Sequence, residues 1–127
     1  MKEQELFEYL KEKYYPDLEL CSDQYNKFDC ESDEYGVFIE LKSRKTHYPT
    51  LLIEYAKYWH LMEKADDKSA TPWYINSTPE GVFGFNLTEH SEPNWHTKRL
   101  PSTTEFANRA HRNKLIGYLD VELGHRL

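Results

Sequence analysis

Two acidic residues and a lysine lie within residues 26–44 at a spacing suited to phosphodiester chemistry. Asp29 comes first, and Glu40 and Lys42 follow with one residue between them. Two carboxylates held together bind Mg²⁺, which prefers oxygen ligands and keeps several of its waters. Such an ion polarises a phosphodiester and activates a nearby water, while a lysine ammonium stabilises charge on the phosphoryl oxygens. These residue types point to metal-assisted hydrolysis.

Alternating residues around Glu40 predict the strand that must position this group. Val37, Ile39 and Leu41 form one apolar set, and they alternate with Phe38, Glu40 and Lys42. A period of two indicates a strand with two different faces. Residues 32–36, SDEYG, have the composition of a hairpin connection, with residues 24–31 as the preceding strand. Folding back at this turn brings Asp29 beside Glu40 and Lys42.

The Glu-Leu-Lys triplet also has a simpler interpretation. An E-x-K pattern on a strand is frequent by chance, and it often forms a solvated face or a cross-strand ion pair. The surrounding sequence favours the site: Asp29 lies on the preceding strand, the alternate face is apolar, and Arg44 and Lys45 follow immediately. In a nuclease, a basic loop at 43–47 would contact phosphates, with Arg44 best suited to bidentate binding.

Asp29, the apolar strand and Glu40-Leu41-Lys42 together resemble the core of the PD-(D/E)xK nuclease superfamily, which includes type II restriction enzymes and Holliday-junction resolvases. Phe28 stands where the family name has proline. The resemblance implies an α/β, restriction-endonuclease-like fold, with a central mixed β-sheet flanked by helices. It also implies that Asp29, Glu40 and the Leu41 carbonyl bind Mg²⁺, with Mn²⁺ able to substitute, and that Lys42 assists the nucleophile.

The expected function is therefore that of a Mg²⁺-dependent endonuclease that hydrolyses DNA phosphodiester bonds. RNA remains open as a substrate, because the same site serves both nucleic acids. A nuclease-like fold kept as a non-catalytic binding or assembly protein is the alternative, since the net charge of −6 disfavours a simple nucleic-acid binder. Double-strand or junction cleavage by so small a unit requires two copies, so we expect a homodimer.

Length and composition limit the remaining classes. We expect residues 1–127 to form one domain with a core rich in aromatic residues. No apolar run approaches the ~20 residues that span a bilayer, so we expect no membrane association and a cytoplasmic protein. Cys21 and Cys30 lack CxxC spacing and are expected to be reduced thiols. Six Lys or Arg against three Asp or Glu in residues 93–127 leave the C-terminal part basic.

Periodicity predicts the other elements. Helices are expected over residues 2–14, 49–64 and 104–116, and strands over 72–77, 81–87 and, at an edge, 95–100. The first helix offers Glu3, Glu5 and Glu8 to the site without distinguishing one of them, and the second offers Lys57 or Tyr55. The basic third helix is expected either to approach DNA or to form a solvated face, and residues 117–127 to pair with a second subunit.

Overall fold

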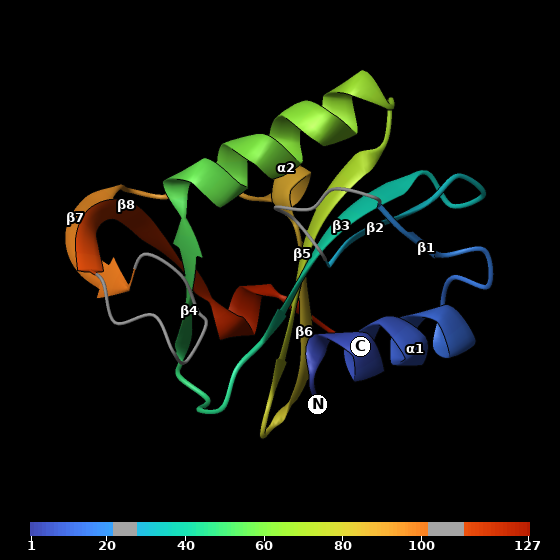
Figure 1. The fold of residues 1–127 in the computed structure, drawn as a ribbon, viewed down its shortest axis with the longest axis horizontal. Helices are drawn as coiled ribbons and strands as arrows, with labels where there is room; N and C mark the ends of the chain where they lie inside the picture. Colours follow the sequence, from blue (N-terminus) through green and yellow to red (C-terminus); the bar gives the residue numbers. More distant parts are fainter. Residues whose placement is uncertain (22–27, 102–110) are drawn as a thin grey trace.

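Two sheets and two α-helices make up the described part of the chain, residues 1–21, 28–101 and 111–127 of a computed structural model (Figure 1). The larger sheet has six strands in the order β1-β2-β3-β5-β6-β9, and the smaller has three in the order β4-β8-β7. The larger sheet contains β1 (Glu19–Leu20), β2 (Asp29–Ser32), β3 (Val37–Ser43), β5 (Thr71–Thr78), β6 (Gly81–Asn86) and β9 (His125–Arg126). The smaller contains β4 (Thr50–Glu54), β7 (His96–Pro101) and β8 (His111–Asp120).

The larger sheet is mixed because of one connection. Strands β3 and β5 run parallel, and the chain between them crosses through β4 and helix α2 (Tyr55–Asp67). Every other pairing in this sheet is antiparallel. Helix α1 (Glu3–Lys13) precedes the sheet, and short 3-10 turns at Leu87–Glu89 and Val121–Leu123 complete the elements. The predicted α/β architecture, a central mixed sheet with flanking helices, is confirmed.

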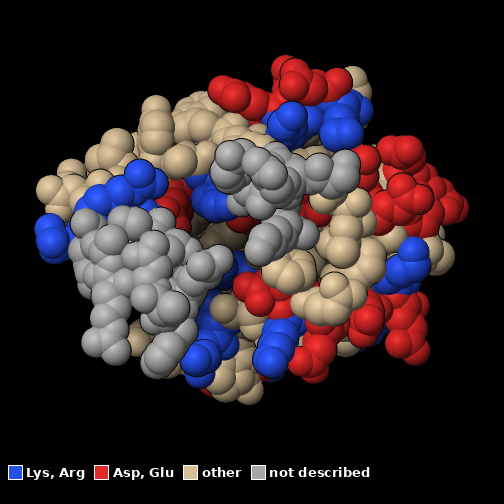
Figure 2. Space-filling view, viewed as in Figure 1, with Lys and Arg blue, Asp and Glu red and all other residues tan. Residues whose placement is uncertain are grey.

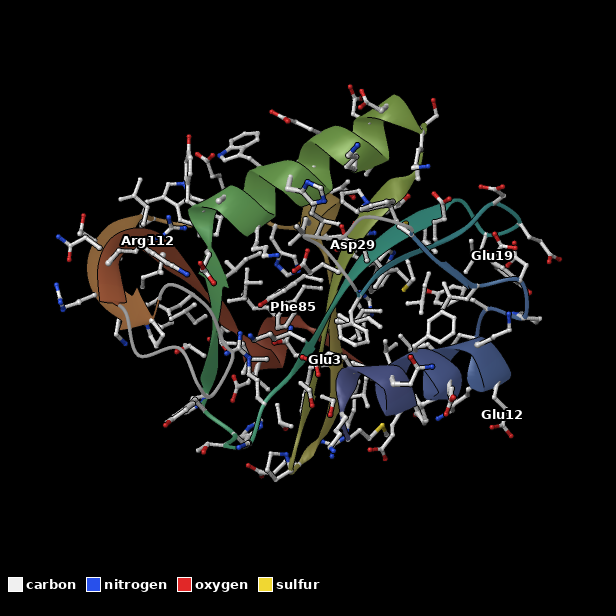
Figure 3. The ribbon with its side chains drawn as sticks, in the orientation of Figure 1. Glu3, Glu12, Glu19, Asp29, Phe85 and Arg112 are labelled. Carbon is white, nitrogen blue, oxygen red and sulfur yellow. The ribbon has the colours of Figure 1, made fainter. Side chains whose placement is uncertain are left out.

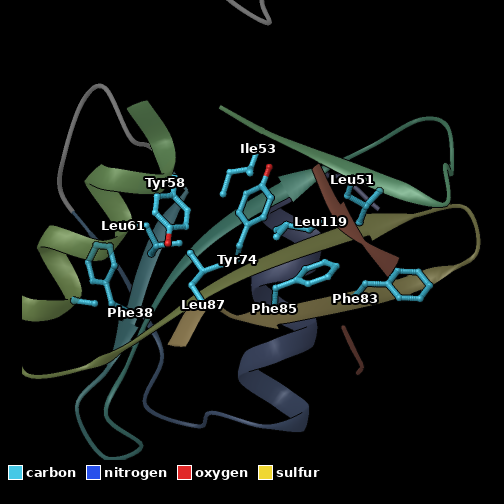
Figure 4. Packing of buried hydrophobic residues seen from close by; sticks show 11 residues of the cluster. Phe38, Leu51, Ile53, Tyr58, Leu61, Tyr74, Phe83, Phe85, Leu87 and Leu119 are labelled. Atoms are coloured by element: carbon cyan, nitrogen blue, oxygen red, sulfur yellow. The ribbon is translucent and has the colours of Figure 1, made fainter. Parts of the chain in front are cut away.

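The two faces of β3 pack against different helices, as its alternating sequence predicts. Val37, Ile39 and Leu41 lie in a core cluster with Leu6 and Leu10 of α1. On the opposite face, Phe38 belongs to a second cluster with α2, β4, β5 and β6 (Figure 4). Members of this second cluster include Ile53, Tyr58, Leu61, Tyr74, Phe85 and Leu119. Each large apolar side chain removed from water contributes roughly 1.5–3 kcal/mol, so both helices are held to the sheet by burial.

The helix predicted over residues 49–64 is wrong in its first part. Thr50–Glu54 is strand β4, and the helix begins only at Tyr55 and continues to Asp67. Leu51 and Ile53 are buried and alternate with the less buried Leu52, which is a strand pattern. β4 is stabilised by pairing with β8, far away in the sequence, and local spacing does not reveal that partner.

The C-terminal predictions need two corrections. Residues 102–110 lie outside the described part, but His111–Asp120 is a strand, so the predicted helix is wrong over 111–116. The tail predicted to meet a second subunit instead pairs within the chain: Leu119 is opposite Leu51, and β9 pairs with β6. Strand β7 at His96–Pro101 confirms the predicted edge segment. No helix in the described residues is long and apolar enough to cross a membrane.

Candidate active site on strands β2 and β3

Asp29 and Glu40 lie directly opposite each other on antiparallel neighbours. Asp29 opens β2, and its register partner on β3 is Glu40. Side chains of directly opposed residues share a sheet face, so both carboxylates point toward the α2 side. Asp29 is 3% exposed and Glu40 8% exposed. The structure therefore brings together the two acids that the sequence singled out, and it buries both.

Burial makes this pair of carboxylates expensive to ionise. Desolvation, and then the charge of Asp29, raise the pKa of Glu40 to about 8. The Lys57 ammonium of α2 lies 3.6 Å from Glu40 Oε1 and favours the ionised form. Glu40 Oε2 is buried and has no hydrogen-bond partner among the described residues. Glu40 therefore has one carboxylate oxygen beside the Lys57 ammonium and one buried oxygen without a partner in the described part of the chain.

Helix α2 lies over the acid pair and contributes two side chains to it. His60 Nε2 lies 2.7 Å from Asp29 Oδ2, one helical turn along from Lys57. Lys57 was one of the two helix residues proposed from the sequence, and the structure places it at Glu40. The other, Tyr55, is 41% exposed and packs its ring 5.1 Å from that of Trp95. His60 was missed, although its spacing of three from Lys57 was a usable signal.

Lys42 follows Glu40 on the same face of β3 and is half-buried. Both residues line a cavity of about 210 Å³ with Tyr74 of β5, Glu54 and Lys114. Burial and then the charge of Arg44 lower the pKa of Lys42, while Glu3, Glu54 and Glu40 oppose the shift. Asp29 and His60 line a second cavity of about 390 Å³. Glu40 thus lines the smaller cavity together with Lys42, and Asp29 lines the larger one together with His60.

Leu41 can contribute to such a site only through its main chain. Its side chain is 4% exposed and packs in the α1 cluster, on the face away from Glu40. Among the described residues, no group of three or more His, Cys, Asp or Glu side chains is placed to hold a metal ion. Asp29 and Glu40 thus form a pair of facing carboxylates, and carboxylate oxygens are ligands that suit a hard cation retaining several waters.

Two other residues weighed from the sequence have defined places. The Arg44 guanidinium is engaged inside the protein: Nε donates to Asn76 Oδ1 at 2.7 Å, and Nη2 donates to Tyr74 Oη at 3.1 Å and to the Leu52 carbonyl. It therefore connects β3 with β4 and β5 while lining the same cavity as Lys42, and its contact with phosphates stays a prediction. Glu3, at the start of α1, is the acid of that helix whose charge acts on Lys42 (Figure 3).

Comparison with solved structures identifies the fold. The chain is similar to Hjc of Archaeoglobus fulgidus, a Holliday junction resolvase from an archaeal hyperthermophile, with a TM-score of 0.61 and 15% sequence identity. The match covers 98% of this chain and 88% of that one. No protein-family model matches the sequence, and neither does any curated protein. The nuclease-type architecture expected from the sequence is therefore confirmed as a fold.

Proposed function

We propose that this protein is a metal-dependent nuclease that hydrolyses DNA phosphodiester bonds. The observation that carries the proposal is the register of β2 and β3, which sets Asp29 opposite Glu40 with Lys42 on the same face. The fold shared with a Holliday junction resolvase supports it. Phosphoryl transfer depends largely on positioning and electrostatic stabilisation, and these rigid strands supply both.

The residues present fit a divalent cation. Two buried carboxylates face each other, one with an oxygen lacking a partner among the described residues, and desolvation penalises the ionisation of Glu40. A cation between Asp29 and Glu40, with the Leu41 carbonyl as a third oxygen, would balance this charge. Mg²⁺ is the expected ion and Mn²⁺ a substitute. When bound, the ion would supply Lewis-acid polarisation of the phosphodiester.

The protein side chains would position and stabilise the reacting groups. Lys42 can donate hydrogen bonds to an attacking water or to a phosphoryl oxygen from the smaller cavity. Its lowered pKa reflects partial desolvation, which strengthens its interaction with developing negative charge. Lys57 adds a second cation beside Glu40, and His60 holds Asp29 from the other side. The same geometry would serve RNA as well. DNA is proposed as the substrate because the structurally similar protein is a Holliday junction resolvase.

One such site cuts one strand at a time. We therefore also propose that a homodimer carries out double-strand or junction cleavage. Light scattering or sedimentation of the purified protein, alone and with a four-way DNA junction, measures this directly. A monomer under both conditions would remove the dimer from the proposal and leave single-strand nicking.

A plasmid-nicking assay tests the activity. Purified protein is incubated with supercoiled plasmid or a four-way junction, with Mg²⁺ or Mn²⁺ and with EDTA. Cleavage should require the metal and should disappear in Glu40→Ala and Lys42→Ala. The matched control is Glu12→Ala, which removes an exposed carboxylate from the far end of α1 (Figure 3). Circular dichroism checks that each variant is folded.

Binding of Mn²⁺, followed by titration calorimetry, separates the two candidate functions. The nuclease is supported if wild type binds Mn²⁺ and cleaves DNA, and if Asp29→Asn and Glu40→Gln lose both properties. A folded protein that binds nucleic acid but cleaves no duplex, junction or RNA substrate would instead be a non-catalytic binding or assembly protein.

A further inference from the structure

Strands β7 and β8 form a ribbon with an unusual charge composition. Over His96–Pro101 and His111–Asp120 the ribbon contains four Lys or Arg residues, Lys98, Arg99, Arg112 and Lys114, against a single acid, Asp120, at its far end. The whole chain, in contrast, carries a net charge of −6. In Figure 2, Lys and Arg atoms lie at the left edge, where Figure 1 places this ribbon, whereas Asp and Glu atoms gather at the opposite edge.

The strand register divides these cations between the two faces of the ribbon. Lys98 is paired with Lys114, and Leu100 with Arg112, so these four side chains share one face. Arg99 is paired with Asn113 and lies on the other face. Lys98, Arg112 and Lys114 therefore lie on a single face of the ribbon. Lys98 and Lys114 are directly opposite each other, and such a pair of like charges destabilises a sheet.

The face with three cations is continuous with the proposed active site. Lys114 and Leu100 line the 210 Å³ cavity together with Glu40 and Lys42. Lys114 is paired with Glu54 at 2.9 Å, which neutralises the cation nearest the site. Lys98 and Arg112 are exposed, and neither forms a salt bridge with any other described residue. Their charge is therefore presented to solvent on the strand face that Leu100 and Lys114 connect to the cavity.

We propose that the Lys98–Arg112 face of the β7–β8 ribbon binds the phosphate backbone of duplex DNA beside the cleaved bond. The inference rests on the proposed function for the identity of the nucleic acid. Charge complementarity carries it: in an acidic protein, two exposed cations with no salt bridge to the described residues lie on a strand face that leads into the candidate active site. Phosphate contacts position a duplex without reading its sequence, so the face would set where the backbone lies relative to Glu40 and Lys42.

DNA binding in EDTA tests the proposal, because cleavage is not needed for the readout. Fluorescence anisotropy with a labelled duplex gives the dissociation constant as a function of salt. The logarithm of the binding constant falls linearly with the logarithm of the salt concentration, and each lost phosphate contact should reduce the steepness of this fall by about 0.9. Lys98→Ala/Arg112→Ala should therefore reduce the steepness by about 1.8. The affinity of this variant should fall at every salt concentration at which the wild type binds measurably.

Two controls remove positive charge from other surfaces. Arg99→Ala alters an exposed cation on the same strand but on the opposite face, and should lower the slope by less than half as much. Lys11→Ala/Lys13→Ala removes two exposed cations from α1, which packs on the other side of the large sheet. Because this double variant matches the net charge of Lys98→Ala/Arg112→Ala, any difference between the two variants reports position and not overall charge.

The outcomes separate this inference from the proposed function. Equal salt slopes for the two double variants would overturn the ribbon as the DNA contact, even if the wild type cleaves DNA. Loss of DNA binding in Lys98→Ala/Arg112→Ala would uphold it, even if no cleavage is found. If the substitution weakens binding of an RNA duplex while leaving DNA binding unchanged, the assignment to DNA is overturned.

Discussion

The imidazole of His60 lies 2.7 Å from Asp29 Oδ2, so helix α2 holds the first carboxylate of the candidate site directly. Asp29 is the first residue of β2, where the ladder to β3 ends. A contact from a helix packed against the Phe38 face fixes the side chain at that point. His60 is thus placed as a positioning residue, while Asp29 itself would meet the metal.

His60→Ala should weaken metal binding without unfolding the protein. Removing a partner that orients a metal-binding carboxylate typically costs about 10- to 100-fold in affinity. Titration calorimetry with Mn²⁺ gives the dissociation constant, and Lys64→Ala, one turn further along α2, is the matched control. An unchanged Mn²⁺ affinity in His60→Ala would show that Asp29 needs no support from α2.

Glu40→Gln should change how stability depends on pH in the metal-free protein. The pKa of Glu40 is about 8 in the folded state, against 4.5 for an ordinary glutamate. The folded state therefore holds the proton more tightly, so this group lowers stability as the pH rises from about 4.5 to about 8. Glutamine removes the penalty, and the variant should be more stable than wild type by roughly 1–4 kcal/mol near pH 9.

Urea unfolding in EDTA, repeated near pH 4 and pH 9, measures this difference. The gain from Glu40→Gln should be present at the higher pH and nearly absent at the lower one. A gain of equal size at both pH values would mean that ionisation of Glu40 is not its cause. Adding Mn²⁺ should reverse the ranking at high pH, because the cation stabilises only the protein with two carboxylates.

Arg44→Lys should destabilise the fold. The guanidinium donates to Asn76, Tyr74 and the Leu52 carbonyl, and a lysine ammonium cannot reproduce this planar set of donors. Leaving buried acceptors without donors should cost about 1–3 kcal/mol. Chemical denaturation measures the loss in free energy of unfolding. The control is Lys45→Ala, a substitution at the exposed neighbouring residue. A stable Arg44→Lys protein with weakened DNA binding would restore the phosphate-contact role expected from sequence.

Gly117→Ala should also destabilise the protein, because β8 passes closely over a loop. An added Cβ at Gly117 would lie 2.6 Å from Pro93 Cβ and 3.2 Å from the Trp95 ring. Such overpacking typically costs about 1–3 kcal/mol. Thermal unfolding should show a lower midpoint than in Asn113→Ala, an exposed position on the same strand. A midpoint equal to that of the control would argue against the close approach.

The sequence by itself determined the local elements that carry the site. Alternation over residues 37–42 reports which side of a strand is apolar, and the hairpin composition of residues 32–36 places Asp29 on the adjacent strand. Both signals come from neighbouring residues, so reading them requires no distant partner. The apolar spacing of α1 is of the same kind. These patterns were sufficient to predict that Asp29, Glu40 and Lys42 lie together, and the resemblance of that group to a known family then implied the fold class.

Only the tertiary structure decided what depends on distant pairing. Thr50–Glu54 is a strand because β8 pairs with it, and residues 111–116 are a strand because they pair with β7. His60 joins Asp29, and Arg44 turns inward, because α2 and β4 pack on the Phe38 face of β3. The free energy of these contacts comes from residues remote in the chain, which local periodicity does not report.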